Sequence, residues 1–220
     1  MRAYDWTNEQ QEIFKDIQSV FKSDNTDDSS FLLASEHLYK LSYMNPTLAP
    51  QLLGAVNDVL KSDKLKAESL RYINLTFNCM FGNNDIDNQG LMPSVHDTIR
   101  KSLQSDKNDG TSLAAMYTLL GRQCGTYNHN PEICFDLVKT GMQSSKNTPS
   151  SIECACEALD CISTNSHCST QLLAKIRMMK HLALKKGLTA DIKEGMAKTK
   201  ESGYKHISRT PSLNKGGREE

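Results

Sequence analysis

The sequence predicts an all-α fold of about four to five stacked helix pairs, because one serine signature returns along the chain at a helix-pair period. The signature begins at Ser23, Ser62, Ser105 and Ser144, so successive copies lie 39, 43 and 39 residues apart. Seven positions after each start stands a second serine, followed by a bulky apolar residue; these serines are Ser30, Ser69, Ser112 and Ser151. A fixed period of about 40 residues is typical of stacked helical repeats rather than of a closed globule with a catalytic cleft.

A helix is predicted to end just before each first serine. Ten, six and two positions before it, every copy carries an apolar residue, and steps of four place these residues on one helical face. The three positions hold Ile13, Leu52, Val95 and Cys134, then Ile17, Val56, Ile99 and Val138, then Phe21, Leu60, Leu103 and Met142. We expect this stripe to be buried in every copy.

A second helix is predicted to follow each second serine. The positions one, four and eight beyond it are again apolar in every copy. They hold Phe31, Leu70, Leu113 and Ile152, then Ala34, Ile73, Met116 and Ala155, then Leu38, Phe77, Leu120 and Leu159. Each repeat therefore supplies two amphipathic helices, which bury their stripes by stacking on neighbouring repeats.

The predicted helical repeat domain covers residues 1–187, with units starting near residues 23, 62, 105 and 144. A capping box, Thr7 to Gln10, opens a first capping helix over residues 8–22. A last helix over about residues 169–186 keeps Leu172, Ile176 and Met179 on one face. The pattern allows a short helix over 188–200, and residues 201–220 form a polar tail that has too little to bury and is predicted to be disordered.

Charge is balanced overall and uneven along the chain. Lysine plus arginine and aspartate plus glutamate each number 26, so net charge favours neither nucleic acid nor a strongly acidic partner. Residues 1–30 hold seven acidic and three basic side chains, whereas a run near the C-terminus is basic without an acid. That run consists of Lys175, Arg177, Lys180, Lys185 and Lys186. The favoured interpretation is that this run forms a solvated helix face. The alternative is that it binds anionic lipid or an acidic partner.

The compartment is predicted to be cytoplasmic. No apolar run approaches the about 20 residues of a membrane span, and the N-terminus lacks the apolar core of a signal peptide. Seven cysteines, an odd number, favour reduced and mostly buried thiols over a disulfide framework.

No catalytic residue, metal site or cofactor is predicted. The richest ligand stretch is Cys154, Cys156, Cys161, His167 and Cys168, but Cys156 would lie on nearly the opposite side of a helix from Cys154. Buried core thiols are the favoured interpretation, and a metal site or a reactive thiol stays open. No glycine-rich phosphate loop follows a strand pattern, so nucleotide chemistry has no support. No small-molecule substrate is expected.

Paired helices at this period, with Asn45-Pro46 and Asn130-Pro131 at the turns, resemble the armadillo and HEAT families of α-solenoids. The resemblance covers roughly residues 8–186. It implies a right-handed α-solenoid whose inner helices line a groove for extended peptides or protein surfaces. The chain departs from the armadillo pattern because its units have two helices and lack the glycine expected after a short first helix.

A polar row follows the helices that end before each first serine. Five and one positions before it stand Gln18 and Lys22, Asn57 and Lys61, Arg100 and Gln104, and Lys139 and Gln143. Stacking would turn them into a ladder of amide and basic groups that suits the backbone or acidic side chains of another protein, although an ordinary solvated helix flank has the same composition. The expected function is a non-enzymatic scaffold or adaptor that binds an extended peptide or protein surface; the alternative is a membrane- or nucleic-acid-associated regulator that uses the basic helix 172–186.

Overall fold

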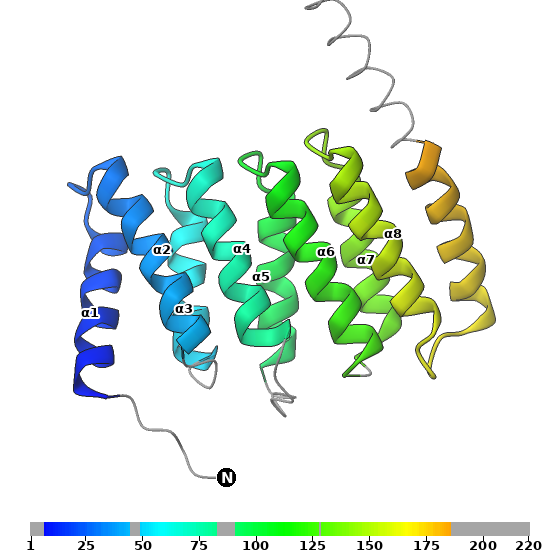
Figure 1. Cartoon of the computed structure of the whole chain (residues 1–220), viewed down its shortest axis with the longest axis horizontal. Coiled ribbons are helices and arrows are strands. Elements are labelled where there is room, and N and C mark those ends of the chain that lie inside the picture. Colours follow the sequence, from blue (N-terminus) through cyan, green and yellow to red (C-terminus); the bar gives the residue numbers. More distant parts are fainter. Residues whose placement is uncertain (1–6, 45–48, 83–90, 128, 186–220) are drawn as a thin grey trace, which may run out of the picture.

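The computed structural model describes residues 7–44, 49–82, 91–127 and 129–185, and every regular element in these ranges is a helix (Figure 1). The predicted all-α class is therefore confirmed. The helices are α1 (Asn8–Lys22), α2 (Asp28–Met44), α3 (Ala49–Lys61), α4 (Ala67–Gly82), α5 (Met92–Gln104), α6 (Gly110–Gly125), α7 (Pro131–Met142) and α8 (Pro149–Ser163), followed by a further helix at 170–185. None of these helices is both long and apolar enough to cross a bilayer. The predicted short helix over 188–200 and the tail over 201–220 lie outside the described residues.

The helices stand side by side in two layers. Even-numbered helices pack on one another in chain order, α2 on α4, α4 on α6 and α6 on α8, and α1, α3, α5 and α7 form a second, odd-numbered layer. In Figure 1 the even-numbered layer lies in front of α3, α5 and α7, and the helix at 170–185 stands at the far end of the row. Neighbours in the even-numbered layer contact each other much more extensively than neighbours in the odd-numbered layer.

The core fills the space between the layers with the predicted stripes. All twelve residues of the second-helix stripe are buried, and so are most of the first-helix stripe. Leu60 is only partly buried, and Ile13 is 39% exposed, so the prediction that Ile13 is buried is wrong. The physical reason is its place in the first helix, because no described helix precedes α1 and covers that side.

Each serine signature forms the same tight turn between the two helices of a pair. The first serine's hydroxyl oxygen accepts a hydrogen bond from the backbone N–H two residues on, at 3.3 Å in Ser23 and 3.2 Å in Ser62, Ser105 and Ser144. Such local bonds are how serine favours turns over helix continuation. The repeated serine thus encodes the chain reversal itself.

The second serine of the signature lies in the first turn of the following helix, where backbone donors need caps. The backbone N–H groups of Ser30 and Ser112 donate to the carboxylates of Asp27 and Asp109 at 2.8 and 2.7 Å. In the last copy Thr148 and Ser151 cap each other in a capping box. The predicted box at Thr7 and Gln10 is also present at the start of α1.

Polar side chains tie successive helix pairs together. Buried Asn74 in α4 donates to the carbonyl of Ser112 in α6 at 3.3 Å and accepts from the hydroxyl of Ser102 in α5 at 2.6 Å. Arg71 in α4 donates to the Asp109 carboxylate that caps α6, at 2.7 Å. Each of these bonds spans neighbouring pairs, so it fixes how one pair sits on the next.

Glycines let the even-numbered helices approach closely. A Cβ atom at Gly121 of α6 would lie 3.1 Å from the Cα of Ala158 in α8, and one at Gly125 would lie 3.3 Å from the Cβ of Cys161. Larger side chains would push α6 and α8 apart. These contacts contribute to the tighter spacing of the even-numbered layer.

Candidate protein-binding surfaces

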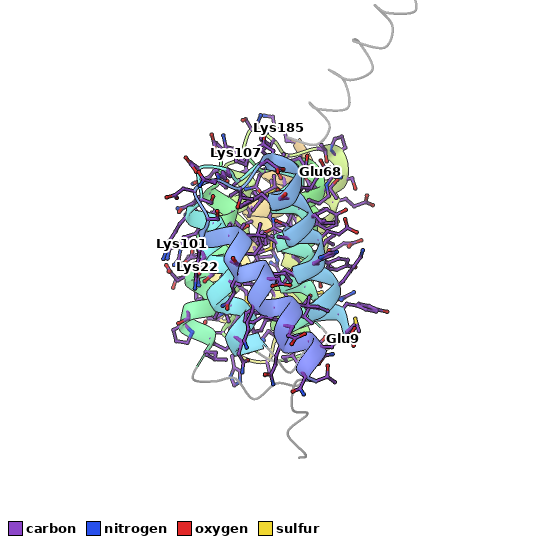
Figure 2. All side chains as sticks on the ribbon, turned by 90° about the vertical axis from the view of Figure 1, so that its left-hand side faces the viewer. Glu9, Lys22, Glu68, Lys101, Lys107 and Lys185 are labelled. Carbon is purple, nitrogen blue, oxygen red and sulfur yellow. The ribbon has the colours of Figure 1, made fainter. Side chains whose placement is uncertain are left out.

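The eight residues of the polar ladder all belong to the odd-numbered layer. They lie on α1, α3, α5 and α7, with Gln143 at the end of α7. Lys22, Lys61, Arg100, Gln104, Lys139 and Gln143 are exposed, whereas Gln18 and Asn57 are partly buried. Figure 2, which looks along the row from the α1 end, shows Lys22 and the α5 residue Lys101 on the same side of the molecule.

Asn57 does not extend the ladder, because both ends of its amide are used within the protein. Its NH₂ group donates to the Leu53 carbonyl at 3.1 Å, and its oxygen accepts from the Thr98 hydroxyl of α5 at 3.1 Å. Asn57 thus connects α3 to α5, and its role is structural.

A shallow groove lies where the ladder crosses from α5 to α7. It has a volume of about 320 Å³, and the ladder amides Gln104 and Gln143 line it together with the serine turns at the ends of the two helices. Arg100 and Lys139 stand one helical turn before these amides. This part of the ladder is the best suited to bind a polypeptide backbone, because amide side chains both donate and accept hydrogen bonds.

Carboxylates that the ladder prediction missed accompany its cations. Asp97 stands three residues before Arg100, and Asp136 stands three residues before Lys139, and both aspartates are exposed. Asp97 also pairs with Lys101 at 2.6 Å, and that hydrogen bond holds the pKa of Asp97 below its usual value. The face therefore carries both signs of charge. The sequence could have indicated this, because each aspartate stands three residues before a cation and so lies beside it on a helix.

The outer face of the even-numbered layer carries a different set of side chains. The rings of Tyr39 in α2 and Tyr72 in α4 lie 6.2 Å apart, and Arg122 in α6 donates to the amide oxygen of Asn78 in α4 at 3.4 Å. Tyrosine and arginine are enriched in protein interfaces, whereas lysine and aspartate are depleted there. Sequence reasoning passed over this face because its residues share no repeated pattern.

A groove of about 380 Å³ continues this face between α6 and α8. Gly121, Gly125 and Ala158 line it with small side chains, and Thr118 and Cys154 add polar groups. The small residues that draw the two helices together thus also leave room beside them. The sequence signal that was available is the pair of glycines four residues apart in α6, Gly121 and Gly125, together with Ala158 in α8.

The basic helix at the end of the row is partly neutralised by its neighbours. Lys175 lies 3.9 Å from Glu132 of α7, and Lys180 lies 2.6 Å from Asp160 of α8. Arg177 and Lys185 are exposed, and Lys186 lies outside the described residues. The alternative basic patch is therefore smaller than its sequence indicates.

Six of the seven thiols have raised pKa values, whereas a hydrogen bond with Cys134 lowers the pKa of Cys124, which is buried. Cys124, Cys134 and Cys156 are buried, Cys79, Cys154 and Cys168 are half-buried, and only Cys161 is exposed. Burial raises the pKa values of Cys154, Cys156 and Cys161, which keeps these thiols protonated. In the part of the chain that the structure describes, no group of three or more His, Cys, Asp or Glu residues could hold a metal ion.

Two histidines, His96 of α5 and His129 of the α6–α7 connection, lie close together. His96 of α5 is buried, its Nε2 atom has no hydrogen-bond partner, and its ring lies 6.4 Å from that of His129. Burial, with smaller contributions from His129 and Arg100, lowers the pKa of His96 to about 4. Both rings are therefore neutral at physiological pH and act in packing.

No protein family, curated protein sequence or solved structure matches this chain. Its function is therefore inferred from the two layers of helices and from the side chains that they expose.

Proposed function

We propose that the protein is a non-enzymatic interaction scaffold or adaptor that binds an extended peptide or a protein surface. We further propose that its two-layered row of helix pairs is a right-handed α-solenoid of the HEAT and armadillo type. A stack of this kind offers a long continuous surface without needing a catalytic centre.

The observation that carries the proposal is the more extensive contact between neighbouring helices in the even-numbered layer, together with the side chains that this layer exposes. A row of helix pairs bends toward the layer whose helices lie closer together, and here that is the even-numbered layer. The outer face of the even-numbered layer then lies on the concave side of the bend. It presents Tyr39, Tyr72 and Arg122 and leads into the groove between α6 and α8. Aromatic rings supply apolar contact area, and Arg122 supplies donors for carbonyl or carboxylate groups of the bound segment.

The polar ladder on the odd-numbered layer is the competing surface for the same function. It offers the amides of Gln104 and Gln143 beside Arg100 and Lys139, but its neighbouring aspartates reduce its attraction for an acidic segment. We therefore assign the main contact to the even-numbered face, and the ladder becomes one of the outcomes that the experiment separates.

The test is affinity capture from a lysate, read by mass spectrometry, with two matched variants. Arg122→Glu reverses an exposed arginine on the even-numbered face, and Arg100→Glu makes the same change on the ladder. A partner retained by the wild type and by Arg100→Glu, and lost by Arg122→Glu, supports the proposed face. Circular dichroism checks that both variants keep the wild-type helix content.

The opposite pattern, with loss only in Arg100→Glu, moves the site to the ladder. Equal recovery by both variants contradicts binding through either face. Recovery of nucleic acid or lipid that disappears in Arg177→Glu and falls steeply with salt would favour the regulator that uses the basic helix.

A further inference from the structure

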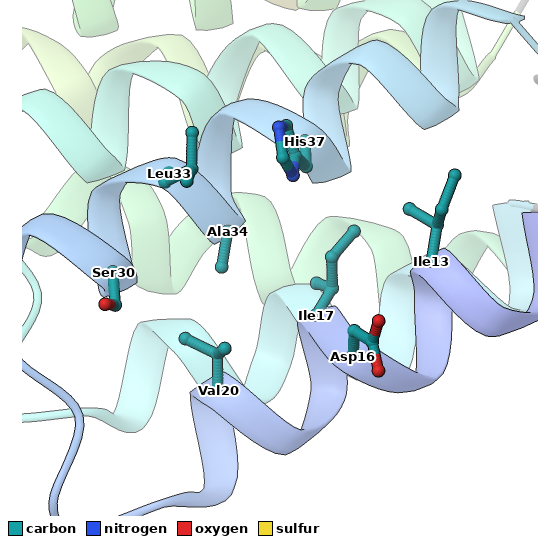
Figure 3. Close-up of a pocket in the computed structure, with 8 residues that line it drawn as sticks. All are labelled: Ile13, Asp16, Ile17, Val20, Ser30, Leu33, Ala34 and His37. Carbon is teal, nitrogen blue, oxygen red and sulfur yellow. The ribbon is translucent and has the colours of Figure 1, made fainter.

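The first end of the row has an open apolar pocket between α1 and α2 (Figure 3). Its volume is about 340 Å³, and Ile13, Val20 and Leu33 line it together with Asp16 and His37. Ile13 is 39% exposed and Leu33 is 51% exposed, and because both line one pocket they form a continuous apolar opening rather than two scattered exposures.

In the later helix pairs, the preceding pair covers the positions that are open here. The repeat partners of Ile13 are Leu52, Val95 and Cys134, and those of His37 are Thr76, Leu119 and Ala158; all six are buried. Since the repeats share one geometry, the pocket is the place that a preceding helix would fill.

The opposite end of the row exposes apolar side chains on a helix. The helix at 170–185 buries Leu172 and Ile176 toward the row, yet Met178 and Leu182, which share a helical face at a spacing of four, are 63% and 51% exposed. Among the described residues, no later helix covers this side. An amphipathic helix with such anchors suits an apolar groove on another helix pair.

The two ends also carry opposite charge. Glu9 and Asp16 are exposed on the side of α1 that carries Ile13, with Glu12 beside them, while the exposed bases Lys15 and Lys22 lie on another side of this helix. The helix at 170–185 contains no acidic residue and exposes Arg177. The whole chain has a formal net charge of zero, so this asymmetry lies along its length. Complementary charge at two ends of one molecule favours and orients their association.

From these observations we infer that the protein associates with a second copy of itself, head to tail. The helix at 170–185 of one copy docks on the α1/α2 pocket of the next, with Met178 and Leu182 supplying its apolar contacts and Arg177 facing Asp16. Such a contact is heterologous, so it builds open chains unless the bend closes a ring. This goes beyond the proposed binding function and uses neither of the two faces considered for it.

Sedimentation of the full chain tests this inference at increasing concentration and at two salt concentrations. The wild type should at least double its weight-average mass as concentration rises, and added salt should weaken the effect. Leu33→Glu blocks the pocket and Leu182→Glu blocks the helix, and each should stay monomeric alone. Their equimolar mixture should give a heterodimer and nothing larger, because each variant retains one intact end.

Gln104→Glu, which adds a charge in the middle of the row, is the control and should associate like the wild type. A wild type that stays monomeric at every concentration in low salt overturns the inference. So does self-association of Leu33→Glu alone, because that outcome means a symmetric contact between two C-terminal helices.

A charge exchange tests the same contact if a leucine variant loses helicity. Asp16→Lys and Arg177→Glu each change one exposed residue and should each weaken association. The double variant restores an opposite pair in the interface and should associate again. Failure of the double variant to recover above either single variant overturns the proposed pairing.

Discussion

Single residues in this protein decide how closely helices approach. Gly141 in α7 is such a residue, because a Cβ atom there would lie 2.7 Å from the ring of Tyr117, which is fully buried and donates its hydroxyl to Asn147 at 3.0 Å. A Cβ atom at Gly54 of α3 would have no neighbouring atom within 4 Å. Gly141 is therefore buried against a ring, whereas Gly54 is exposed with open space beside it.

We expect Gly141→Ala to destabilise the protein by about 1–3 kcal/mol, because overpacking against Tyr117 outweighs the better helix propensity of alanine. Gly54→Ala should stabilise it by about 0.5–1 kcal/mol, since only the propensity changes. Urea unfolding followed by circular dichroism measures both. Equal effects of the two substitutions would show that packing at Gly141 is not limiting.

The buried His96 makes stability depend on pH. Its pKa in the folded protein is about 4, below the ordinary value of 6.5, so the unfolded chain binds more protons between these values. The contribution of neutral His96 to the free energy of unfolding is thus complete above pH 6.5. It falls as the pH drops toward 4, by about 3 kcal/mol at most. Burial lowers the pKa of His129 as well, which adds a change of the same sign.

We expect the urea midpoint to decrease between pH 7 and pH 5, a range that lies above the ordinary pKa values of the carboxylates. His96→Gln should flatten this slope, whereas His167→Gln, which changes a histidine at the exposed turn before the last helix, should leave it intact. An unchanged slope in His96→Gln would mean that other groups carry the pH dependence.

At the scale of elements, the start of α6 is tied to the rest of the row by one carboxylate. Asp109 caps the helix through Ser112 and also binds Arg71 of α4. Burial raises its pKa, but these hydrogen bonds outweigh burial and hold the pKa below the usual value. At the start of α2, Asp27 accepts equivalent bonds from Ser30, but it is fully exposed.

Asp109→Ala should therefore cost about 2 kcal/mol, because it removes a cap and leaves the Arg71 guanidinium without its carboxylate. Asp27→Ala should cost clearly less. Thermal unfolding of the two variants side by side checks the order, and a larger loss in Asp27→Ala would contradict it.

The helices themselves could be predicted because their stripes repeat with the serine signature. Apolar residues at helical spacing must be covered, and the second-helix stripe is covered in every copy. The exposure of Ile13 could not be read from the same pattern, because burial there depends on a neighbour that the first pair lacks. The structural role of Asn57 likewise depends on its hydrogen bond with Thr98, which is 41 residues away in the sequence.

The candidate site was predictable only in part for the same reason. Sequence spacing places Gln104 and Gln143 in equivalent positions, and they do line one groove. It does not reveal which layer packs more tightly, since that follows from glycines meeting Ala158 and Cys161 across a helix interface. The choice between two faces of the row therefore had to await the arrangement in space.

At the scale of the whole molecule, stability should vary along the row. Each pair contacts its neighbours, α1 has one open side, and α4 and α6 are covered on both sides in their layer. Linear arrays of this kind open from their ends.

Amide hydrogen exchange should consequently be fastest in α1 and slowest in α4 and α6. If copies associate head to tail, protection of α1 should also rise with protein concentration, whereas that of α4 should not. Uniform protection in all described helices would instead indicate that the row unfolds as one cooperative unit.

The identical serine turns also make this chain extensible by copying. Residues 105–143 contain one turn, α6 and α7, and a second copy of them inserted after residue 143 would join Gln143 to Ser105. The chain already contains that dipeptide at Gln104–Ser105, so the splice introduces no sequence that the protein does not use. The length of the array is then limited by the fit of α6 against its own duplicate and not by the connections, and a gene could lengthen the protein by one tandem duplication.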